Sequence, residues 1–570
     1  SKYGPEVTSV ILIKTKKKTE GLHATISANI SVSERMSESS NGGIGYRMEN
    51  GLYVFGDFSA DESRFKQKRH YSETVSGYDM GSVGNSDTYM TCRNRTRSIM
   101  ADGGLIYDFG KHSVGVKYSF SRTPFSRFVS NCLTLTDLLQ SDEISSTSNM
   151  LSQKHQHYLN SFLQFVLPKS INLKVDMDYI HSRSTSTDNA DEEQTATEFK
   201  NIGKNWSDLL AAKLELEKSI GKVTASAGGD YTYTDHRQDF ISHATGDIAQ
   251  ILKPAADYVK QNLYSAFMSF DWKISDRWQV YGGVRYDGTR TKYVRNNIYE
   301  KSLSKSYKDL LPDIGVQFRS LVMLSMSYRQ KVYRPSYSSL SNNYSYVTPT
   351  HWETGNPELM KMKAQSLQLD MSYRKFMLQA EATHYNRKIG ISCRYYPEIN
   401  ASVTETVNLP SYNMLQIVAV QRLDVKRWHP TIQGVMVLQD LKFGEPKRSY
   451  STPFYQISFN NRFDLPRTFY AYLSFFVLGG GNIETQFCRT TWQTSLTVSK
   501  NLGNWNFNLS ANDVFGTWRQ KVMTHTNNLI YSYNIKGASQ YISLSVRYRF
   551  RTAKKTYSGK SVRSDEINRL

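Results

Sequence analysis

Two short motifs in the sequence combine side chains that could bind a metal ion or activate water. His155 and His157 are two residues apart, so in a strand both imidazoles would lie on one face, a spacing that can bind metal. Because no third potential metal ligand lies nearby in the sequence, we interpret the pair as polar residues of the lumen or of an interface. Asp235 and His236 could form a water-activating dyad, but neighbouring strand residues face opposite sides. We therefore expect no catalytic residues, no metal site, no cofactor and no enzyme activity.

Other reactive residue types are also poorly placed for chemistry. Gly559-Lys560-Ser561 is similar to the end of a phosphate-binding loop, but Lys554 stands where that motif requires glycine. The four cysteines are too scattered for a zinc motif or a disulfide scaffold. Cys92 and Cys132 flank the outer ends of a predicted hairpin, where a disulfide would need Cα atoms within about 7 Å. We expect free thiols.

The segment 333–359 is the best candidate for ligand binding. Its aromatic and polar side chains suit sugars, peptides or metal chelates. The alternative is that these aromatics pack the loop onto itself. The candidate ligand-binding residues are Arg334, Tyr337, Tyr344, Tyr346, His351 and Trp352. A second polar stretch, 61–70, is rich in lysine and arginine; we interpret it as a solvated loop, with lipopolysaccharide contact as the second interpretation.

The elements that must position these residues are strands, and the clearest one is 541–550. Apolar and polar residues alternate along it, so a strand here has one apolar and one polar face. Its length of about ten residues suits a tilted transmembrane strand. We expect Ile542, Leu544, Val546 and Phe550 to face lipid, and Ser543, Ser545, Arg547 and Arg549 to face a lumen.

The same alternation recurs through the chain and predicts an all-β fold. Short turns alternate with longer polar connections, as in outer-membrane barrels, and we count about 22 strands. The sequence therefore predicts a transmembrane antiparallel β-barrel. The expected long loops are 61–88, 129–150, 186–200, 240–257, 335–360 and 513–538.

The composition fits a membrane barrel rather than a nucleic-acid-binding protein. Aromatic residues make up 13% of the chain, which suits interfacial girdles. The formal net charge is +20, but the basic residues lack the clustering that nucleic-acid recognition needs. We expect no nucleic-acid partner, and lipid headgroups or lipopolysaccharide phosphates as the counterparts of this charge.

Several stretches resemble the barrel region of TonB-dependent outer-membrane receptors that follow a plug domain. The stretches that carry the resemblance are 7–21, 278–286, 309–312, 328–337, 355–359, 512–515, the strand 541–550 and the end 565–570. The most specific is 328–337, Tyr-Arg-Gln-Lys-Val-Tyr-Arg-Pro-Ser-Tyr. The resemblance covers nearly the whole chain.

This resemblance implies the energised import of a bound extracellular ligand through a barrel in the cell outer membrane. It implies an upstream plug domain and a TonB-type energising complex as partners, and it allows a surface lipoprotein partner. We expect residues 1–20 to be the end of the plug and a linker, 21–550 the barrel, and 551–570 a flexible periplasmic tail. The ligand class (siderophore, oligosaccharide or peptide) stays open. The alternative is a surface-binding protein or adhesin that uses the barrel as an anchor.

Overall fold

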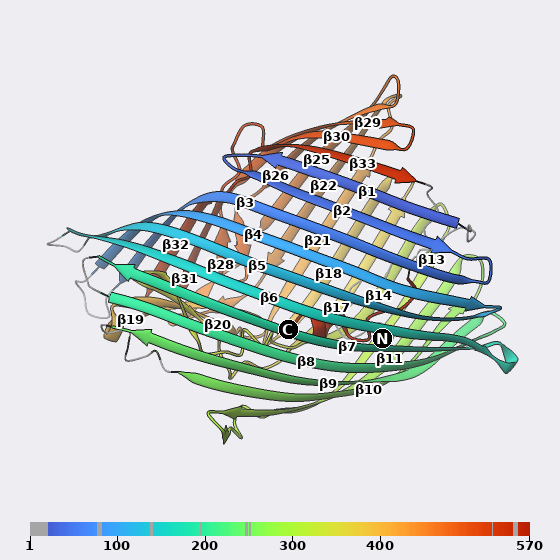
Figure 1. Ribbon diagram of the computed structural model, residues 1–570, viewed down its shortest axis with the longest axis horizontal. Helices are drawn as coiled ribbons and strands as arrows, with labels where there is room; N and C mark the ends of the chain where they lie inside the picture. Colours follow the sequence, from blue (N-terminus) through green and yellow to red (C-terminus); the bar gives the residue numbers. More distant parts are fainter. Residues whose placement is uncertain are drawn as a thin grey trace.

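A computed structural model of the chain describes residues 21–76, 83–136, 141–193, 197–245, 249, 252, 254–526, 528–550 and 557–570. These residues form one closed antiparallel barrel of 22 wall strands (Figure 1), as the sequence predicted. Strand β33 (Tyr541–Phe550) closes the wall by pairing with β1 (Gly21–Val32) on one side and β30 (Trp505–Asn512) on the other. Closure removes the sheet edges that lipid could not satisfy.

The wall strands follow one another in chain order around the barrel. Besides β1, β30 and β33 they are β2 (Met36–Arg47), β3 (Leu52–Ser76), β4 (Val83–Phe109), β5 (His112–Thr136), β6 (Ser141–Leu167), β7 (Ile171–Glu192), β8 (Thr197–Ile220), β9 (Val223–Ala244), β10 (Ala255–Lys273), β11 (Trp278–Arg295), β13 (Ser306–Arg319), β14 (Val322–Tyr333), β17 (Met362–Tyr373), β18 (Phe376–Asn386), β21 (Tyr412–Arg422), β22 (Trp428–Gln439), β25 (Phe454–Leu465), β26 (Phe469–Leu478) and β29 (Thr491–Leu502). The connections between these strands carry the short strands β12 (Ile298–Tyr299), β15 (Tyr344–Thr348), β16 (His351–Thr354), β19 (Ile389–Tyr396), β20 (Ala401–Asn408), β23 (Lys442–Phe443), β24 (Arg448–Ser449), β27 (Gly481–Ile483), β28 (Gln486–Cys488), β31 (Gln520–Thr526) and β32 (Leu529–Lys536). Within the described residues, two 3-10 turns (Pro168–Ser170 and Pro397–Ile399) and the helix α1 (Ser564–Ile567) are the remaining named elements. No helix in the described part of the chain is long and apolar enough to cross a membrane.

Side chains alternate between the two faces of the wall. Ile542 is 60% and Leu544 48% exposed on the outer face, where Leu544 pairs with Ile30 and Leu509. Ser545 is paired with Asn29 and Asn508 in the same way on the opposite face. The apolar outer face therefore needs lipid to cover it.

The strands β3 to β9 are much longer than a membrane requires. They contain between 22 and 27 residues, against about 10 for a tilted membrane-spanning strand. Most of the stretches 61–88, 129–150 and 186–200 are strand, so the expectation of loops there was wrong. These stretches keep the ladder hydrogen bonds of the hairpins beyond the length that spans a bilayer, and their inner face carries buried side chains such as Tyr71, Met90 and Cys92.

The extended part of β3 is covered by strands that belong to distant loops. Strand β2 pairs with β3 only as far as Glu62, and β32 then takes over the same edge from Lys68 to Val75. Strands β31 and β28 continue this sheet. An edge that the neighbouring wall strand leaves free is thereby paired, which prevents association through it.

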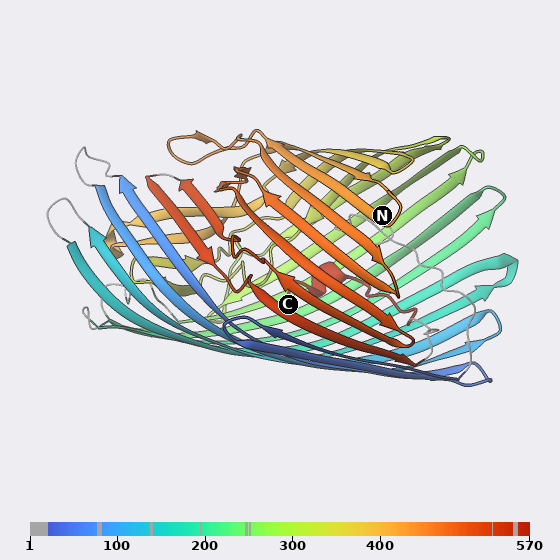
Figure 2. The same cartoon turned by 90° about the horizontal axis from the view of Figure 1, so that it is seen from above.

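Four loop strands form a second sheet, β15–β16–β20–β19, which we call the loop sheet. It lies inside the ring of wall strands (Figure 2). Its buried side chains pack against the inner side of the long strands: Trp352 and Tyr346 share a cluster with Phe199 and Ala190, and Cys393 lies with Tyr71 and Met90. The sheet thus joins the loops of β14, β17, β18 and β21 to the opposite part of the wall.

Residues 557–570, which we call the lumenal segment, lie inside the barrel (Figure 2). Val562, Arg563, Glu566 and Arg569 are buried there. The expectation of a flexible periplasmic tail was therefore wrong for these residues, while 551–556 lie outside the described residues. The segment stays in the lumen because its charged side chains and backbone amides find partners on the wall.

Candidate functional site

The structure divides the six candidate ligand-binding residues between two places. Arg334 and Tyr337 lie in the lumen near the start of the 335–360 loop, whereas the other four belong to the loop sheet. Five of the six are buried: Arg334, Tyr337, Tyr346, His351 and Trp352. Tyr344 is half-buried. In this conformation the buried side chains contact protein rather than the lumen.

Trp352 and Tyr346 dock the loop sheet onto the wall. The ring centroids of Trp352 and Phe199 are 5.0 Å apart in an edge-to-face arrangement, and Tyr346 contacts Trp352 at 5.1 Å in the same way. The hydroxyl of Tyr346 donates to Ser146 Oγ at 3.1 Å. Such pairs add to the burial of apolar area, so these aromatics hold the sheet closed.

His351 is a second anchor of the loop sheet. Its Nδ1 lies 2.8 Å from Glu73 Oε1 on β3 and 2.7 Å from Ser402 Oγ on β20. Its ring stacks on Tyr531 at 4.2 Å between centroids. A catalytic triad needs the acid and the nucleophile on different ring nitrogens. Here Glu73 and Ser402 both lie at Nδ1, and Thr404 Oγ1 lies 3.1 Å from Nε2. Glu73, His351 and Ser402 are buried, so the imidazole is held on both sides and the arrangement is suited to anchoring.

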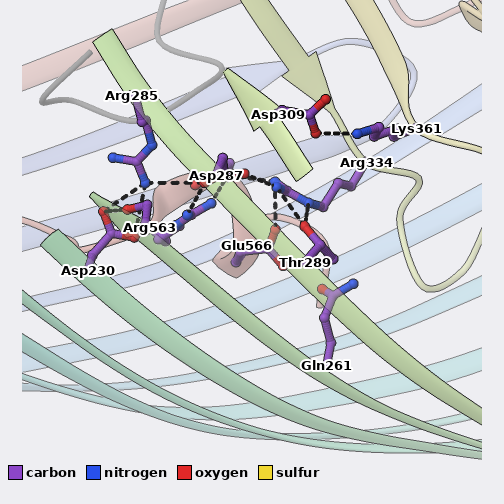
Figure 3. Close-up of polar contacts among 12 residues, drawn as sticks. Asp230, Gln261, Arg285, Asp287, Thr289, Asp309, Arg334, Lys361, Arg563 and Glu566 are labelled. Carbon is purple, nitrogen blue, oxygen red and sulfur yellow. Dashed lines mark hydrogen bonds and ion pairs between the residues drawn. The ribbon is translucent and has the colours of Figure 1, made fainter. Parts of the chain in front are cut away.

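A cluster of charged residues lies on the lumen side of the barrel wall, and we call it the wall site. It consists of Asp230 on β9, Arg285 and Asp287 on β11, and Arg334 after β14 (Figure 3). Arg285 Nη2 lies 2.7 Å from Asp230 Oδ2, and Arg334 forms an ion pair with Asp287. All four residues are buried. Buried charges of this kind persist only when they are paired.

The alternation of the strands explains how the wall site forms. Arg285, Asp287 and Thr289 are two residues apart and face the lumen together, because successive strand residues face opposite sides. Ser265 on β10 is paired with Asp230 of β9 in the ladder and donates to its carboxylate at 2.6 Å. The adjacent strands β9, β10 and β11, together with Arg334 after β14, therefore supply the site and the hydroxyl that supports it.

The lumenal segment completes this cluster with charges of both signs. Arg563 Nε lies 2.9 Å from Asp230 Oδ1, and its Nη2 lies 2.5 Å from Asp287 Oδ1. Glu566 lies 3.5 Å from Arg334. Although burial alone would lower it, Asp230 and Asp287 raise the pKa of Arg563 well above its ordinary value. The guanidinium is therefore charged in the site.

A small cavity lies beside the wall site. Its lining includes Tyr293, Tyr307, Lys305, Lys361 and Arg569. Lys361 is paired with Asp309, and Lys305 Nζ donates to the carbonyl oxygens of Glu358 and Leu359 at 2.7 and 2.9 Å. These two lysines already have partners in the wall and the loop, so the cavity does not present them as free cations.

The sequence motifs that suggested chemistry do not assemble into a reactive site. Asp235 accepts from Tyr258 on the outer side at 2.8 Å, whereas His236 is buried and stacks on Tyr337 with centroids 4.5 Å apart. As predicted, the two face apart. Among the described residues no group of His, Cys, Asp and Glu could hold a metal ion.

All four cysteines are free thiols. In the β4–β5 ladder Cys92 pairs with Val129, and Cys132 pairs with Tyr89. Cys92 is fully buried, while the cross-strand partner of Cys132, Tyr89, is 58% exposed. The two thiols therefore lie on opposite faces of the hairpin, where no disulfide between them is geometrically feasible.

Sequence reasoning missed most of the wall site and all of the lumenal segment's role. Of the wall site it selected only Arg334, as a ligand-binding residue. The signal for Arg285 and Asp287 was present, since opposite charges alternate with apolar residues in 284–288. Nothing near Arg563 indicates a partner that lies 333 positions away in the chain.

The sequence of this barrel matches a known protein family. The model of the outer membrane protein beta-barrel family matches residues 168–548, about two thirds of the chain. The chain belongs to this family. The barrel accordingly lies in the cell outer membrane. No curated protein matches this outer-membrane barrel in sequence.

Solved structures share the fold of the barrel at low sequence identity. The copper transporter OprC superimposes with a TM-score of 0.64 at 11% identity, covering 94% of this chain and 81% of its own. The ferric yersiniabactin uptake receptor FyuA from Yersinia pestis gives 0.58 at 13%, with 94% and 81% covered. The siderophore receptor PirA from Pseudomonas aeruginosa gives 0.57 at 11%, with 94% and 82% covered. At these identities the similarity shows the fold alone, and that fold is the one expected from the receptor resemblance.

Proposed function

We propose that this outer-membrane barrel is the wall of a TonB-dependent receptor that imports a bound extracellular ligand. The observation that carries the proposal is the combination of a 22-strand wall with loop strands folded into its lumen. A wall of this size encloses a space wider than its own side chains can fill. Structures with the same fold carry names of siderophore receptors and a copper transporter, which supports import over anchoring.

The proposal includes an upstream plug domain, of which residues 1–20 are the end, and an energising complex that acts on it. Residues 8–13 read as one apolar strand that needs a sheet to pair with. The 1–20 segment lies outside the described residues. A surface lipoprotein and lipopolysaccharide are further proposed partners, and the class of ligand stays open.

Conductance in planar bilayers tests the plugged-importer proposal. The 1–570 chain should form a large, leaky pore or be unstable, because the loop sheet and the lumenal segment do not replace a domain. A longer chain with its plug should be closed, and it should import ligand only when energy is supplied. Equal, tight closure of both chains would mean that the loops seal the barrel, and the proposal would fail.

We further propose that the six candidate residues contact the ligand when the loop sheet moves away from the wall and Arg334 and Tyr337 separate from the lumenal segment. Five of them are buried in the closed sheet or against the lumenal segment. A triple alanine variant at Arg334, Tyr346 and Trp352 should weaken binding, by about 2 kcal/mol or more for each contributing anchor. Binding and uptake should be measured over a panel of ferric siderophores, copper salts, oligosaccharides and peptides. Unchanged binding and uptake would assign these residues to closure alone.

The second candidate is an adhesin that uses the barrel as an anchor. The long strands β3 to β9 would give it an extended surface, but the similar solved structures are receptors and a transporter, so it is the less favoured function. Protein-dependent attachment of cells to a surface without uptake of any ligand in the panel would support this function over import.

A further inference from the structure

We propose that the lumenal segment is an intramolecular ligand of the wall site, and that it latches the start of the 335–360 loop to the barrel wall. The inference does not depend on import, because it concerns contacts within one chain. It also differs from an expectation of disorder after β33, since the segment is engaged along its length.

The first part of the segment is recognised through its backbone. The amide nitrogen of Lys560 donates to Asp176 Oδ1 at 3.0 Å, and that of Val562 donates to Asp178 Oδ2 at 2.7 Å. The Val562 side chain enters an apolar cluster with Ile180 and Leu209. Strand β7 therefore supplies carboxylates two residues apart that match two backbone donors two residues apart.

The middle of the segment is recognised through its charge. Arg563 reaches both carboxylates of the wall site, and Glu566 faces Arg334, so each segment charge meets the opposite sign. Arg563 is fully buried and Glu566 equally so. A guanidinium held by two carboxylates is a specific contact, because its fixed donor geometry must match both.

The end of the segment contacts the loop. Arg569 Nε donates to the carbonyl oxygen of Pro335 at 2.8 Å, and the amide of Tyr337 donates to the carbonyl oxygen of Arg569 at 3.3 Å. The Arg569 guanidinium also lies 4.5 Å above the Tyr337 ring and donates to Gln261 on β10 at 2.6 Å. Arg569 therefore joins the loop to the wall.

The wall site remains neutral when the segment leaves. Asp230 keeps Arg285 as its partner, and Asp287 keeps Arg285 and Arg334. Two carboxylates and two guanidiniums of the wall thus compensate each other. When the segment undocks, no wall charge is left unpaired. A buried site that required the segment for neutrality would hold it permanently, whereas this one permits exchange.

Thiol alkylation of the assembled barrel tests the latch. Val562→Cys places a thiol in the docked segment, and Ser341→Cys places one in the buried start of the loop. Each is made with and without Arg563→Gln, and the modified sites are mapped by mass spectrometry so that the natural cysteines are read separately. Heat-dependent gel migration verifies that the barrel is folded.

Both introduced thiols should be protected in the otherwise unchanged barrel, and Arg563→Gln should raise both alkylation rates at least tenfold. Ser564→Ala, at an exposed position of the same segment, is the matched control and should change neither rate. Arg569→Gln is a second variant that removes the contact with Pro335 while keeping Arg563, and it should raise the Ser341→Cys rate.

Three results would overturn the proposal. Rapid alkylation at Val562→Cys without Arg563→Gln would show that the segment is not docked, or that another part of the chain holds the wall site. No effect of Arg563→Gln on either thiol would show that the charges do not hold the segment. Release of the segment with an unchanged Ser341→Cys rate would show that it binds without latching the loop.

Discussion

The facing of the closing strand gives the sharpest test of the wall. Leu544 lies on the outer face between Ile30 and Leu509, and Ser545 lies on the lumen face between Asn29 and Asn508. Replacing Leu544 by Arg near the middle of the membrane should destabilise the barrel by about 2–4 kcal/mol. At about 1.4 kcal/mol per factor of ten, this lowers the folding equilibrium constant about 30- to 700-fold.

The matched variant is Ser545→Arg, which introduces the same charge one residue along the strand. Its guanidinium enters a face that already carries polar groups and water, so we expect a change of less than about 1 kcal/mol. The measurement is a urea titration of refolding into lipid vesicles, followed by tryptophan fluorescence and by heat-dependent gel migration. Equal destabilisation by the two variants would show that the assignment of faces is wrong.

Three further predictions follow from the loop sheet and the chain end. Burial raises the pKa of the Cys393 thiol to about 12 from an ordinary value of about 9. The closed sheet therefore loses stability as the pH rises between these values. Alkylation of Cys393, measured from pH 7 to 11, should stay slow until the sheet opens. Trp352→Ala should destabilise the docked sheet by about 3–5 kcal/mol, since it empties the contact with Phe199, and Cys393 alkylation at pH 8 reports the opening; an unchanged rate would contradict the docking role. Deleting 557–570 should leave barrel assembly intact, whereas deleting Tyr541–Phe550 should abolish it because β1 and β30 lose their shared partner; assembly into membranes without that strand would refute the closure.

The wall was predictable because its signal is local. A strand in lipid must alternate apolar and polar residues, and this pattern can be read within ten residues, as in 541–550. The length of the strands beyond the bilayer was not predictable in the same way. Beyond the bilayer the outer face of a hairpin meets water instead of lipid and need not be apolar, so the extended parts of β3 and β4 read as polar loops.

The lumen was less predictable because its contacts join distant parts of the chain. Arg334 was selected as a residue that binds a ligand, and the structure gives it Asp287 and Glu566 as partners. His351 was selected for the same reason, and its partner Glu73 lies 278 positions earlier. The residue types of the segment 333–359 singled out Arg334 and His351 as candidates, but only the closed barrel brings their partners together.

The loop sheet is attached to the barrel at two ends. One end is continuous with the strands β14, β17, β18 and β21, which contain 11 or 12 residues each; the other rests on the tall strands through Trp352, His351 and the Asn201 side chain, which donates to the carbonyl oxygen of Tyr344 at 2.8 Å. The first end is covalent and the second is not. A force on the loop sheet therefore breaks its contacts with the long strands first. The sheet then rotates about its connections to the shorter strands. The space that opens would lie against β3 to β8, so under the proposed import function these long strands would line the path of the ligand.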